Sequence, residues 1–382
     1  MAFKVAERGA IAPFIVMDVM RAAALRQSQG GDVIHLEVGQ PAGAAPEPVL
    51  AAARRALDAD ALGYTVAFGL DALRERIAGH YRHAYGVAVA PESVVVTTGS
   101  SAGFLLAFLA AFAPGDRVAV AAPGYPAYRN ILKAVGVECV PVPVGPASRW
   151  QLTAAVLEAL EGRLDGVVVA SPSNPTGSML SPHEVAELAT WCELRQVRLV
   201  SDEIYHGITY GRPAATAAGG GAHLLVVNSF SKYYGMTGWR LGWMVVPPDL
   251  SRAVECLQQN LFISPPTLSQ FAALAAFDCL DELDRRVAGY RTNRDILLEE
   301  LPKAGFTRLA PSDGAFYLYA DIAELTNDSQ DFSRRMLAEI GVAATPGIDF
   351  DPTQGHRTLR FSYAGAAADM VEAARRLKDW RK

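Results

Sequence analysis

Lys232 and Arg240 are the residues whose surroundings point most directly to chemistry. They are the only Lys, Arg, Asp or Glu residues between Pro213 and Pro248, and their neighbours are apolar, aromatic or hydroxyl-bearing. A lone lysine is usually a solvated surface group, but two cations buried without a carboxylate need an anionic ligand. A desolvated lysine beside another cation also has a lowered pKa, which makes its amine a nucleophile toward an aldehyde. Pyridoxal phosphate carries an aldehyde and a phosphate, so this segment predicts a site for that cofactor.

The elements that must position these cations follow from an alternation of apolar runs and helical patterns. The predicted buried strands cover residues 94–97, 118–120, 167–170, 199–201 and 224–227. The helical patterns between them lie near 101–113, 125–135 and 182–196. This alternation favours an α/β fold in which helices sandwich a mostly parallel sheet. Ligands of such sheets bind beyond the carboxyl ends of the strands, so the residues after each strand are the candidates for chemistry.

Two of these strand ends offer contacts for a phosphate and for a planar ring. The turn Ser100-Ser101-Ala102 opens a helix, where free N–H groups and hydroxyls can cradle a phosphate. Taken alone, that turn is typical of an ordinary helix cap. Tyr125 follows the next strand and places an aromatic face where a ring could stack, although a turn tyrosine is more often simply packed.

The next two strand ends offer partners for a pyridine ring. Asn174, in a proline-rich turn, can donate a hydrogen bond to a ring substituent. Asp202 ends its strand and is followed by Tyr205. A carboxylate at that position is usually a helix cap or part of an ion pair, but beside a pyridine ring it can pair with the protonated nitrogen.

The chain as a whole resembles the class I and II aminotransferases, the fold-type I group of pyridoxal-phosphate enzymes. The resemblance extends over nearly the whole chain. It rests on five motifs in the family's order, namely Tyr64-Thr65 with Gly69 and Leu73-Arg74, Ser173-Asn174-Pro175-Thr176-Gly177, Asp202-Glu203-Ile204-Tyr205, Ser229-Phe230-Ser231-Lys232 and Gly238-Trp239-Arg240-Leu241-Gly242.

The resemblance implies a role for each site residue. Lys232 would form the Schiff base with pyridoxal phosphate and move the substrate proton, and Asp202 would hold the ring nitrogen. Asn174 and Tyr205 would bind the ring oxygen. The other implied contacts are Tyr125 stacked on the ring, the phosphate bound by Ser100, Ser101, Ala102, Ser229 and Arg240, Tyr64 reaching the phosphate from the partner subunit of a homodimer, and the substrate carboxylate bound by Gly39, Asn174 and Arg360.

The implied reaction is transfer of an amino group from an L-amino acid to a 2-oxo acid in a ping-pong cycle. A carbon–sulfur β-lyase or another pyridoxal-phosphate lyase on the same scaffold would keep every cofactor residue, so that alternative stays open. The apolar N-terminal arm, with Ile11, Pro13, Phe14 and Ile15, favours a neutral or hydrophobic donor. No second arginine for a distal carboxylate can be assigned.

Composition agrees with a large enzyme that binds neither nucleic acid nor a membrane. The 382 residues are 51% hydrophobic with a net charge of −5, and nucleic-acid binding would require a basic excess. The uncharged stretch 93–115 has a polar centre, so we expect a strand, a turn and a helix there and no membrane span. Four scattered cysteines predict no metal site and a cytoplasmic location.

Two domains are predicted from the order of the motifs. A large cofactor-binding domain is expected over 46–289, and a smaller α/β domain over 1–45 and 290–382, including the N-terminal arm. Residues 265–301 predict one long helical stretch. A nicotinamide dehydrogenase is disfavoured because no G-x-G-x-x-G follows the first strands.

Overall fold

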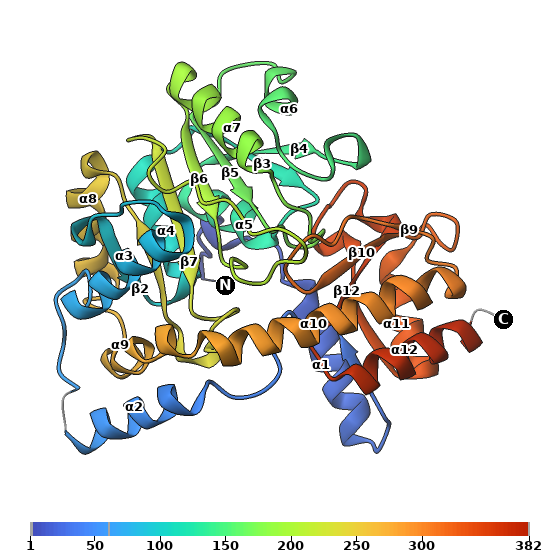
Figure 1. Ribbon diagram of the computed structural model, residues 1–382. Helices are drawn as coiled ribbons and strands as arrows, with labels where there is room; N and C mark the ends of the chain where they lie inside the picture. The colour runs from blue at the N-terminus through green and yellow to red at the C-terminus, as the bar shows by residue number, and fades with distance from the viewer. Residues whose placement is uncertain (1–2, 60–61, 381–382) are drawn as a thin grey trace.

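The computed structural model describes residues 3–59 and 62–380 and contains two sheets, each flanked by helices (Figure 1). The larger sheet has seven strands in the order β2-β8-β7-β6-β5-β3-β4. Only β8 is antiparallel to its neighbours, and the other pairs are parallel. The strands are β2 (Val94–Thr97), β3 (Arg117–Ala122), β4 (Glu138–Pro143), β5 (Gly166–Ala170), β6 (Arg198–Asp202), β7 (Leu224–Ser229) and β8 (Gly242–Val245).

The five strands predicted from the sequence are all present, and their apolar runs are explained by burial on both faces. Alternate residues of a strand point to opposite faces, so Val94 and Val96 enter one core while Val95 enters the other. The first core is completed by α2 (Glu47–Asp58), α3 (Asp71–Tyr85), α6 (Ala154–Glu158), α7 (Pro182–Arg195) and α9 (Thr267–Leu274). The second core is completed by α4 (Gly99–Ala111), α5 (Pro126–Val135) and α8 (Pro248–Leu261).

Two strands of this sheet were not among the predicted ones. β4 carries Pro141 and Pro143, and it lies at the edge of the sheet, where a missing N–H is tolerated. β8 has only four residues and returns antiparallel between β2 and β7. Both strands lack the uninterrupted β-branched run by which the others were predicted.

The smaller sheet has five strands in the order β1-β11-β12-β10-β9. Its strand β1 comes from the N-terminal segment and pairs in parallel with β11. The strands are β1 (Ile34–Leu36), β9 (Arg308–Leu309), β10 (Tyr317–Asp321), β11 (Val342–Pro346) and β12 (Thr358–Ser362), and the helices packed with them are α1 (Ile15–Ser28), α10 (Leu280–Glu300), α11 (Ser329–Ile340) and α12 (Ala367–Trp380). The domain boundaries stay a prediction, and residues 1–2, 60–61 and 381–382 of those ranges lie outside the described part of the chain.

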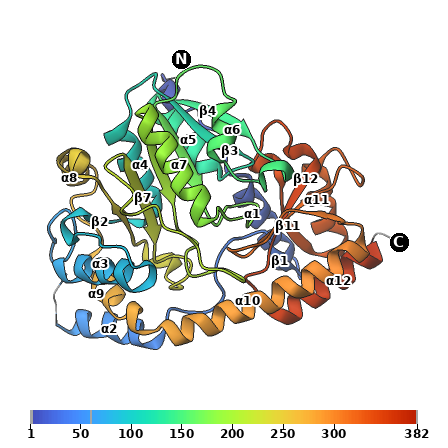
Figure 2. The ribbon, with the colours of Figure 1, turned by 45° about the horizontal axis from the view of Figure 1, so that its top comes forward.

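The long helical stretch predicted over 265–301 is helical over most of its length but is divided into two helices. Helix α9 ends at Leu274, a 3-10 turn covers Ala276–Asp278, and α10 begins only at Leu280. The turn brings Phe277 against Phe230 and Tyr234, with ring centroids 5.7 and 5.3 Å apart. Packing of this aromatic ring therefore overrides the helical pattern, and α10 then runs from beneath the large sheet to the small one (Figure 2).

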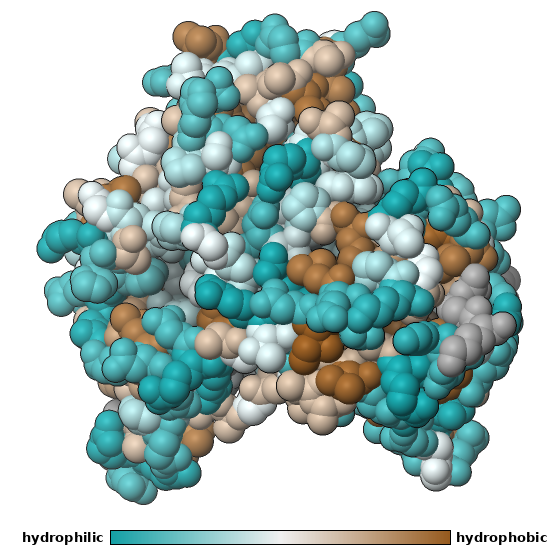
Figure 3. All heavy atoms as spheres, turned by 45° about the vertical axis from the view of Figure 1, so that its right-hand side comes forward, coloured by the Kyte–Doolittle hydropathy of each residue, from teal (hydrophilic) through white to brown (hydrophobic). Residues whose placement is uncertain are grey.

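The surface agrees with a chain whose apolar residues are largely buried. On the face shown in Figure 3, hydrophilic residues predominate and hydrophobic ones form small separate patches. None of the helices in the described part of the chain is long and apolar enough to cross a membrane.

Candidate active site

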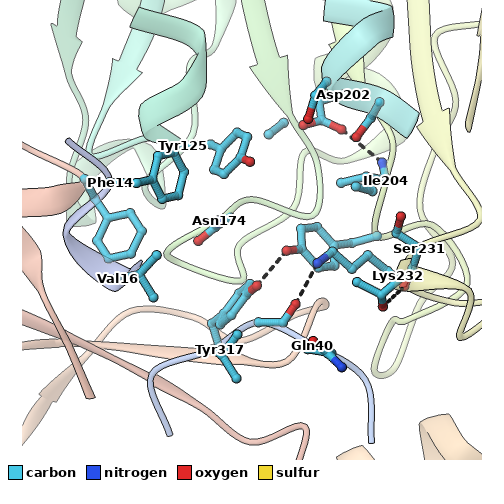
Figure 4. A pocket seen from close by; sticks show the side chains of 18 of the residues that line it. Phe14, Val16, Gln40, Tyr125, Asn174, Asp202, Ile204, Ser231, Lys232 and Tyr317 are labelled. Carbon is cyan, nitrogen blue, oxygen red and sulfur yellow. Dashed lines mark hydrogen bonds between the residues drawn. The ribbon is translucent and has the colours of Figure 1, made fainter. Parts of the chain in front are cut away.

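A cavity of about 270 Å³ lies between the carboxyl ends of the large sheet's central strands and the inner face of the small sheet. The labelled side chains in Figure 4 converge on it from both sheets and from the N-terminal arm. Ten of the residues predicted for the site line it, namely Gly39, Ser100, Ser101, Tyr125, Asn174, Asp202, Tyr205, Lys232, Arg240 and Arg360. Parallel strands present their carboxyl ends at one edge, which explains how turns far apart in sequence meet here.

Lys232 lies in the turn after β7 and points into the cavity, where its side chain is partly buried. Its Nζ donates a hydrogen bond to the carbonyl oxygen of Gly39 at 2.6 Å, and no carboxylate oxygen of the described residues lies within 4 Å of it. Burial lowers the pKa of Lys232 to about 8, and the nearby Arg360 and Arg240 add to that effect. A large share of this lysine is therefore a neutral amine near pH 8.

Asp202, the last residue of β6, is a buried carboxylate without a cationic partner in direct contact within the described chain. One of its oxygens accepts a hydrogen bond from the hydroxyl of Tyr128, and the other accepts one from the backbone N–H of Ile204 at 3.1 Å. Burial raises the pKa of Asp202 to about 6, although these two donors and Lys232 act in the opposite direction. The pKa still leaves Asp202 ionised above pH 6, able to pair with a cationic ring nitrogen.

Arg360 holds the opposite side of the cavity from the middle of β12. Its Nη1 donates to Asn174 Oδ1 at 2.8 Å, and its Nη2 donates to the Glu37 carbonyl at 2.5 Å and to Thr345 Oγ1 at 3.2 Å. Its Nε is buried and has no partner. Arg360 is 4% exposed and no carboxylate of the described chain pairs with it, so its guanidinium presents an uncompensated positive charge to the cavity.

The N-terminus of α4 and Arg240 form a second positively charged region. Helix α4 begins at Gly99, whose φ of 76° suits glycine, and a Cβ atom there would collide with the Arg240 guanidinium. Ser100 and Ser101 then line the cavity in the first turn, where helix N–H groups are free for an anion. Arg240 itself is exposed in the single chain, so the expectation that both cations are buried is wrong for Arg240, which lies at the mouth of the cavity.

Three predicted cofactor contacts do not line the cavity. Ser229 donates its hydroxyl to the Ser231 hydroxyl at 2.9 Å, and Ser231 is the one that faces the cavity. Ala102 is buried within α4, and Tyr64 is 83% exposed on the surface. Their roles stay predictions, because a backbone contact from Ala102 and a contact from Tyr64 to a second subunit are not tested by a single chain.

Several lining residues were not singled out in the sequence. Tyr128 lies on α5, three residues after Tyr125, which precedes the helix. Residues three apart along a helix lie on the same side, so this spacing could have predicted that Tyr128 also faces the cavity. Tyr317, Thr237 and Phe350 gave no such signal, because no local pattern in the sequence marks them as facing the cavity.

The N-terminal arm closes one side of the cavity with apolar side chains. Phe14 packs edge-on against Tyr125, with ring centroids 5.7 Å apart. Val16 and Met20, one turn apart on α1, also line the cavity. The helix start is held by Asp349, whose carboxylate accepts from the backbone N–H groups of Ile15 and Val16 at 3.1 and 3.2 Å. Of the predicted arm residues Ile11, Pro13, Phe14 and Ile15, only Phe14 is in the lining.

Comparison with known proteins agrees with this fold and site. Residues 31–377 match the family described as aminotransferase class I and II. The chain is 53% identical over 381 residues to a Mycobacterium tuberculosis protein named valine–pyruvate aminotransferase, with 99% of this chain and 98% of that protein covered. A solved structure of an aminotransferase from Mycobacterium tuberculosis has a TM-score of 0.97 at 52% identity, with 99% of each chain covered. Thermus thermophilus aspartate aminotransferase with maleate has a TM-score of 0.92 at 31% identity, with 99% of this chain and 100% of that chain covered.

The chain therefore belongs to the class I and II aminotransferases, and the predicted family and α/β fold are confirmed. It is an enzyme that transfers an amino group from an amino acid to a 2-oxo acid. The relatives described above are named aminotransferases, which agrees with the predicted reaction and not with the lyase alternative.

Proposed function

We propose that this enzyme uses pyridoxal phosphate to transfer the amino group of a neutral, apolar L-amino acid to a small 2-oxo acid. The apolar wall of the cavity is the observation that supports this donor, and it consists of Phe14, Val16, Met17, Met20, Val38 and Phe350. The relative named valine–pyruvate aminotransferase supports both substrates, since valine has such a side chain and pyruvate is a small 2-oxo acid.

The cavity's cations also support a donor without a second carboxylate. Among residues 3–59 and 62–380, Lys232, Arg240 and Arg360 are the only Lys or Arg residues that line the cavity. Each has a proposed partner, namely the cofactor aldehyde, the cofactor phosphate and the substrate α-carboxylate. No cation in the lining from the described chain is left for a distal carboxylate.

The residues present fit pyridoxal phosphate. The region formed by Gly99, the α4 N-terminus and Arg240 has the positive charge that a phosphate requires. Asp202 is placed to hold a pyridine nitrogen, and Tyr125, Asn174 and Tyr205 line the space between those ends. When bound there, the cofactor supplies an aldehyde for the lysine and a protonated ring that withdraws electrons from the substrate.

Side chains of this chain bind the substrate, remove its proton and exclude water. Arg360 binds the substrate α-carboxylate, because its planar guanidinium can present two parallel N–H donors. The neutral Lys232 amine removes the proton from the substrate Cα, and its pKa near 8 makes it an effective base at neutral to mildly basic pH. The apolar arm excludes water from the cavity on the side of Tyr125.

A homodimer is proposed because the segment around Tyr64 exposes apolar surface. Tyr64, Val66, Leu261 and Ile263 are each about half exposed or more. Tyr64 and Val66 belong to one segment of the chain, and Leu261 and Ile263 belong to another. These two segments touch, because Thr267 Oγ1 donates a hydrogen bond to the Gly63 carbonyl at 2.7 Å. In this arrangement Tyr64 reaches the phosphate of the partner's cofactor. The four free cysteines support the predicted cytoplasmic location.

The experiment that tests the donor is a half-reaction screen. The holoenzyme is mixed with each common L-amino acid in turn, and loss of the cofactor's visible absorption band is followed together with the product formed. Valine and other branched or apolar amino acids should discharge the band and yield their 2-oxo acids, whereas aspartate and glutamate should react at least about tenfold more slowly, since one unmatched charge costs about 1.4 kcal/mol or more. Equal reactivity with aspartate would contradict the proposed donor, and release of pyruvate and ammonia from a β-substituted amino acid without transfer would favour the lyase.

A further inference from the structure

Tyr317 touches three of the predicted site residues, although it has no assigned role. It is the first residue of β10 and is 1% exposed. In the strand register Tyr319 lies opposite Arg360, so Tyr317, two residues along β10, is on the same face as Arg360. This face is the one that the small sheet turns toward the cavity (Figure 4).

The hydroxyl of Tyr317 lies 2.7 Å from the hydroxyl of Tyr205, and the two rings meet edge to face with centroids 5.6 Å apart. Neither hydroxyl makes another hydrogen bond to the described residues. Each phenol has one proton, so only one of the two can donate to the other. If Tyr317 donates, the proton of Tyr205 is free to point into the cavity.

The ring of Tyr317 supports the guanidinium of Arg360. The Arg360 Cζ lies 4.3 Å from the centroid of that ring, well inside the range of a cation–π contact. The same guanidinium is held in its plane by hydrogen bonds to Asn174 and to the Glu37 carbonyl. The ring therefore helps to fix the orientation in which Arg360 presents its donors.

Gly39 shows how tightly this arrangement is packed. A Cβ atom at position 39 would collide with the Tyr317 hydroxyl, so glycine is required where the segment after β1 passes the tyrosine. The carbonyl of Gly39 accepts the hydrogen bond from Lys232 Nζ. Tyr317 thus contacts the Tyr205 hydroxyl, the Arg360 guanidinium and the Gly39 backbone, which lie on both sides of the cavity.

We infer that Tyr317 is a positioning residue with two separable parts, a hydroxyl that aims the Tyr205 proton at the cofactor ring oxygen and a ring that orients Arg360 for the substrate carboxylate. The inference rests on the proposed function, because it takes the proposed roles of Tyr205 and Arg360 as given. It assigns those two tasks to one side chain that contacts neither reacting atom.

Tyr317→Phe removes the hydroxyl and keeps the ring. A donor to the ring oxygen favours the form of the bound cofactor in which that oxygen carries more negative charge, which is the deprotonated form. The variant should therefore raise the pKa at which the cofactor's visible band changes by about 0.3 to 1 unit, the equivalent of one hydrogen bond. Its KM values for amino acid and oxo acid should stay within about twofold of those of the unmodified enzyme, since the ring contact is kept.

Tyr317→Leu removes the ring as well as the hydroxyl. The same rise in the band's pKa is expected, and KM for both substrates should increase about 5- to 30-fold because the support of Arg360 is lost. The matched control is Tyr319→Phe, which removes a buried hydroxyl two residues along the same strand. That hydroxyl lies 2.6 Å from Thr358 Oγ1, and Tyr319, although on the same face of the sheet, does not line the cavity, so neither the band's pKa nor KM should move.

The outcomes separate the inference from the proposed function. An unchanged band pKa in Tyr317→Phe, or an unchanged KM in Tyr317→Leu, would overturn the inference while the unmodified enzyme still transaminates. An equal shift in Tyr319→Phe would also overturn it, because the effect would then be a general response to loss of a buried hydroxyl. If the unmodified protein forms no visible band with pyridoxal phosphate, the result contradicts the proposed function itself, and with it the inference.

Discussion

Lys232 and Arg360 are both basic residues that face the same cavity, but the contacts that hold their side chains differ. Lys232 lies in a turn after β7 and is held by one hydrogen bond, from its Nζ to Gly39. Arg360 lies within a buried strand, where three hydrogen bonds and two aromatic rings fix its guanidinium. A group that must move a proton needs a mobile chain and a lowered pKa, whereas a group that only binds needs a fixed orientation.

The two sheets supply these two environments. The large sheet contributes its site residues from the carboxyl ends of its strands and from the turns and helix starts that follow them. The small sheet presents side chains from within β10 and β12, which are buried along their length. In the proposed mechanism, the residues that carry out the reaction lie at strand ends, and the residue that binds the substrate lies on a strand face.

Replacement of Lys232 should have the largest effect. Lys232→Ala should abolish the cofactor's visible band and lower the transamination rate at least about 1,000-fold, because both the covalent attachment and the base are lost. The rate and the absorption spectrum measure this directly. Lys133→Ala, at an exposed lysine on α5, is the matched control and should leave both unchanged. Retention of transamination by Lys232→Ala would contradict the proposed mechanism.

Replacement of the fixed cation should have a smaller effect of a different kind. Arg360→Lys keeps the charge but loses the paired donors and the ring contact, so kcat/KM should fall about 10- to 100-fold, mainly through KM. The visible band should be retained, since Arg360 has no proposed contact with the cofactor aldehyde. Steady-state kinetics with both substrates measure the change. A loss confined to kcat would show that Arg360 acts on the reaction step, and it would contradict the proposal that Arg360 only binds the substrate.

The pH dependence of cofactor attachment should give the smallest effect, about tenfold per pH unit at most. Burial lowers the pKa of Lys232 from 10.5 to about 8, so the reactive neutral amine increases with pH up to about 8 and then levels off. The same sign applies to stability, because the folded apoenzyme disfavours the charged amine and gains stability as the pH rises from about 8 toward 10.5.

The measurement is the rate at which the apoenzyme forms the visible band with pyridoxal phosphate between pH 7 and pH 9.5. Free Nα-acetyl-lysine amide is the control, and its rate should keep rising over this range because its pKa is near 10.4. A protein rate that follows the control through pH 9.5 would contradict the lowered pKa of Lys232.

The sequence by itself determined the fold class and ten of the residues that line the cavity. Fully buried strands require apolar runs, and those runs marked β2, β3, β5, β6 and β7. Parallel strands bring their carboxyl ends to one edge, so Asn174, Asp202 and Lys232 were expected together although they are far apart along the chain.

Only the tertiary structure decided which neighbouring side chains face the cavity. Ser231 faces it and Ser229 does not, because the direction of a side chain in a turn depends on the packing around that turn. Tyr128 reaches Asp202 across 74 positions, and Tyr317 reaches Tyr205 across 112. The first contact is set by how α5 packs on the large sheet and the second by how the two sheets dock, and no local pattern in the chain records either arrangement.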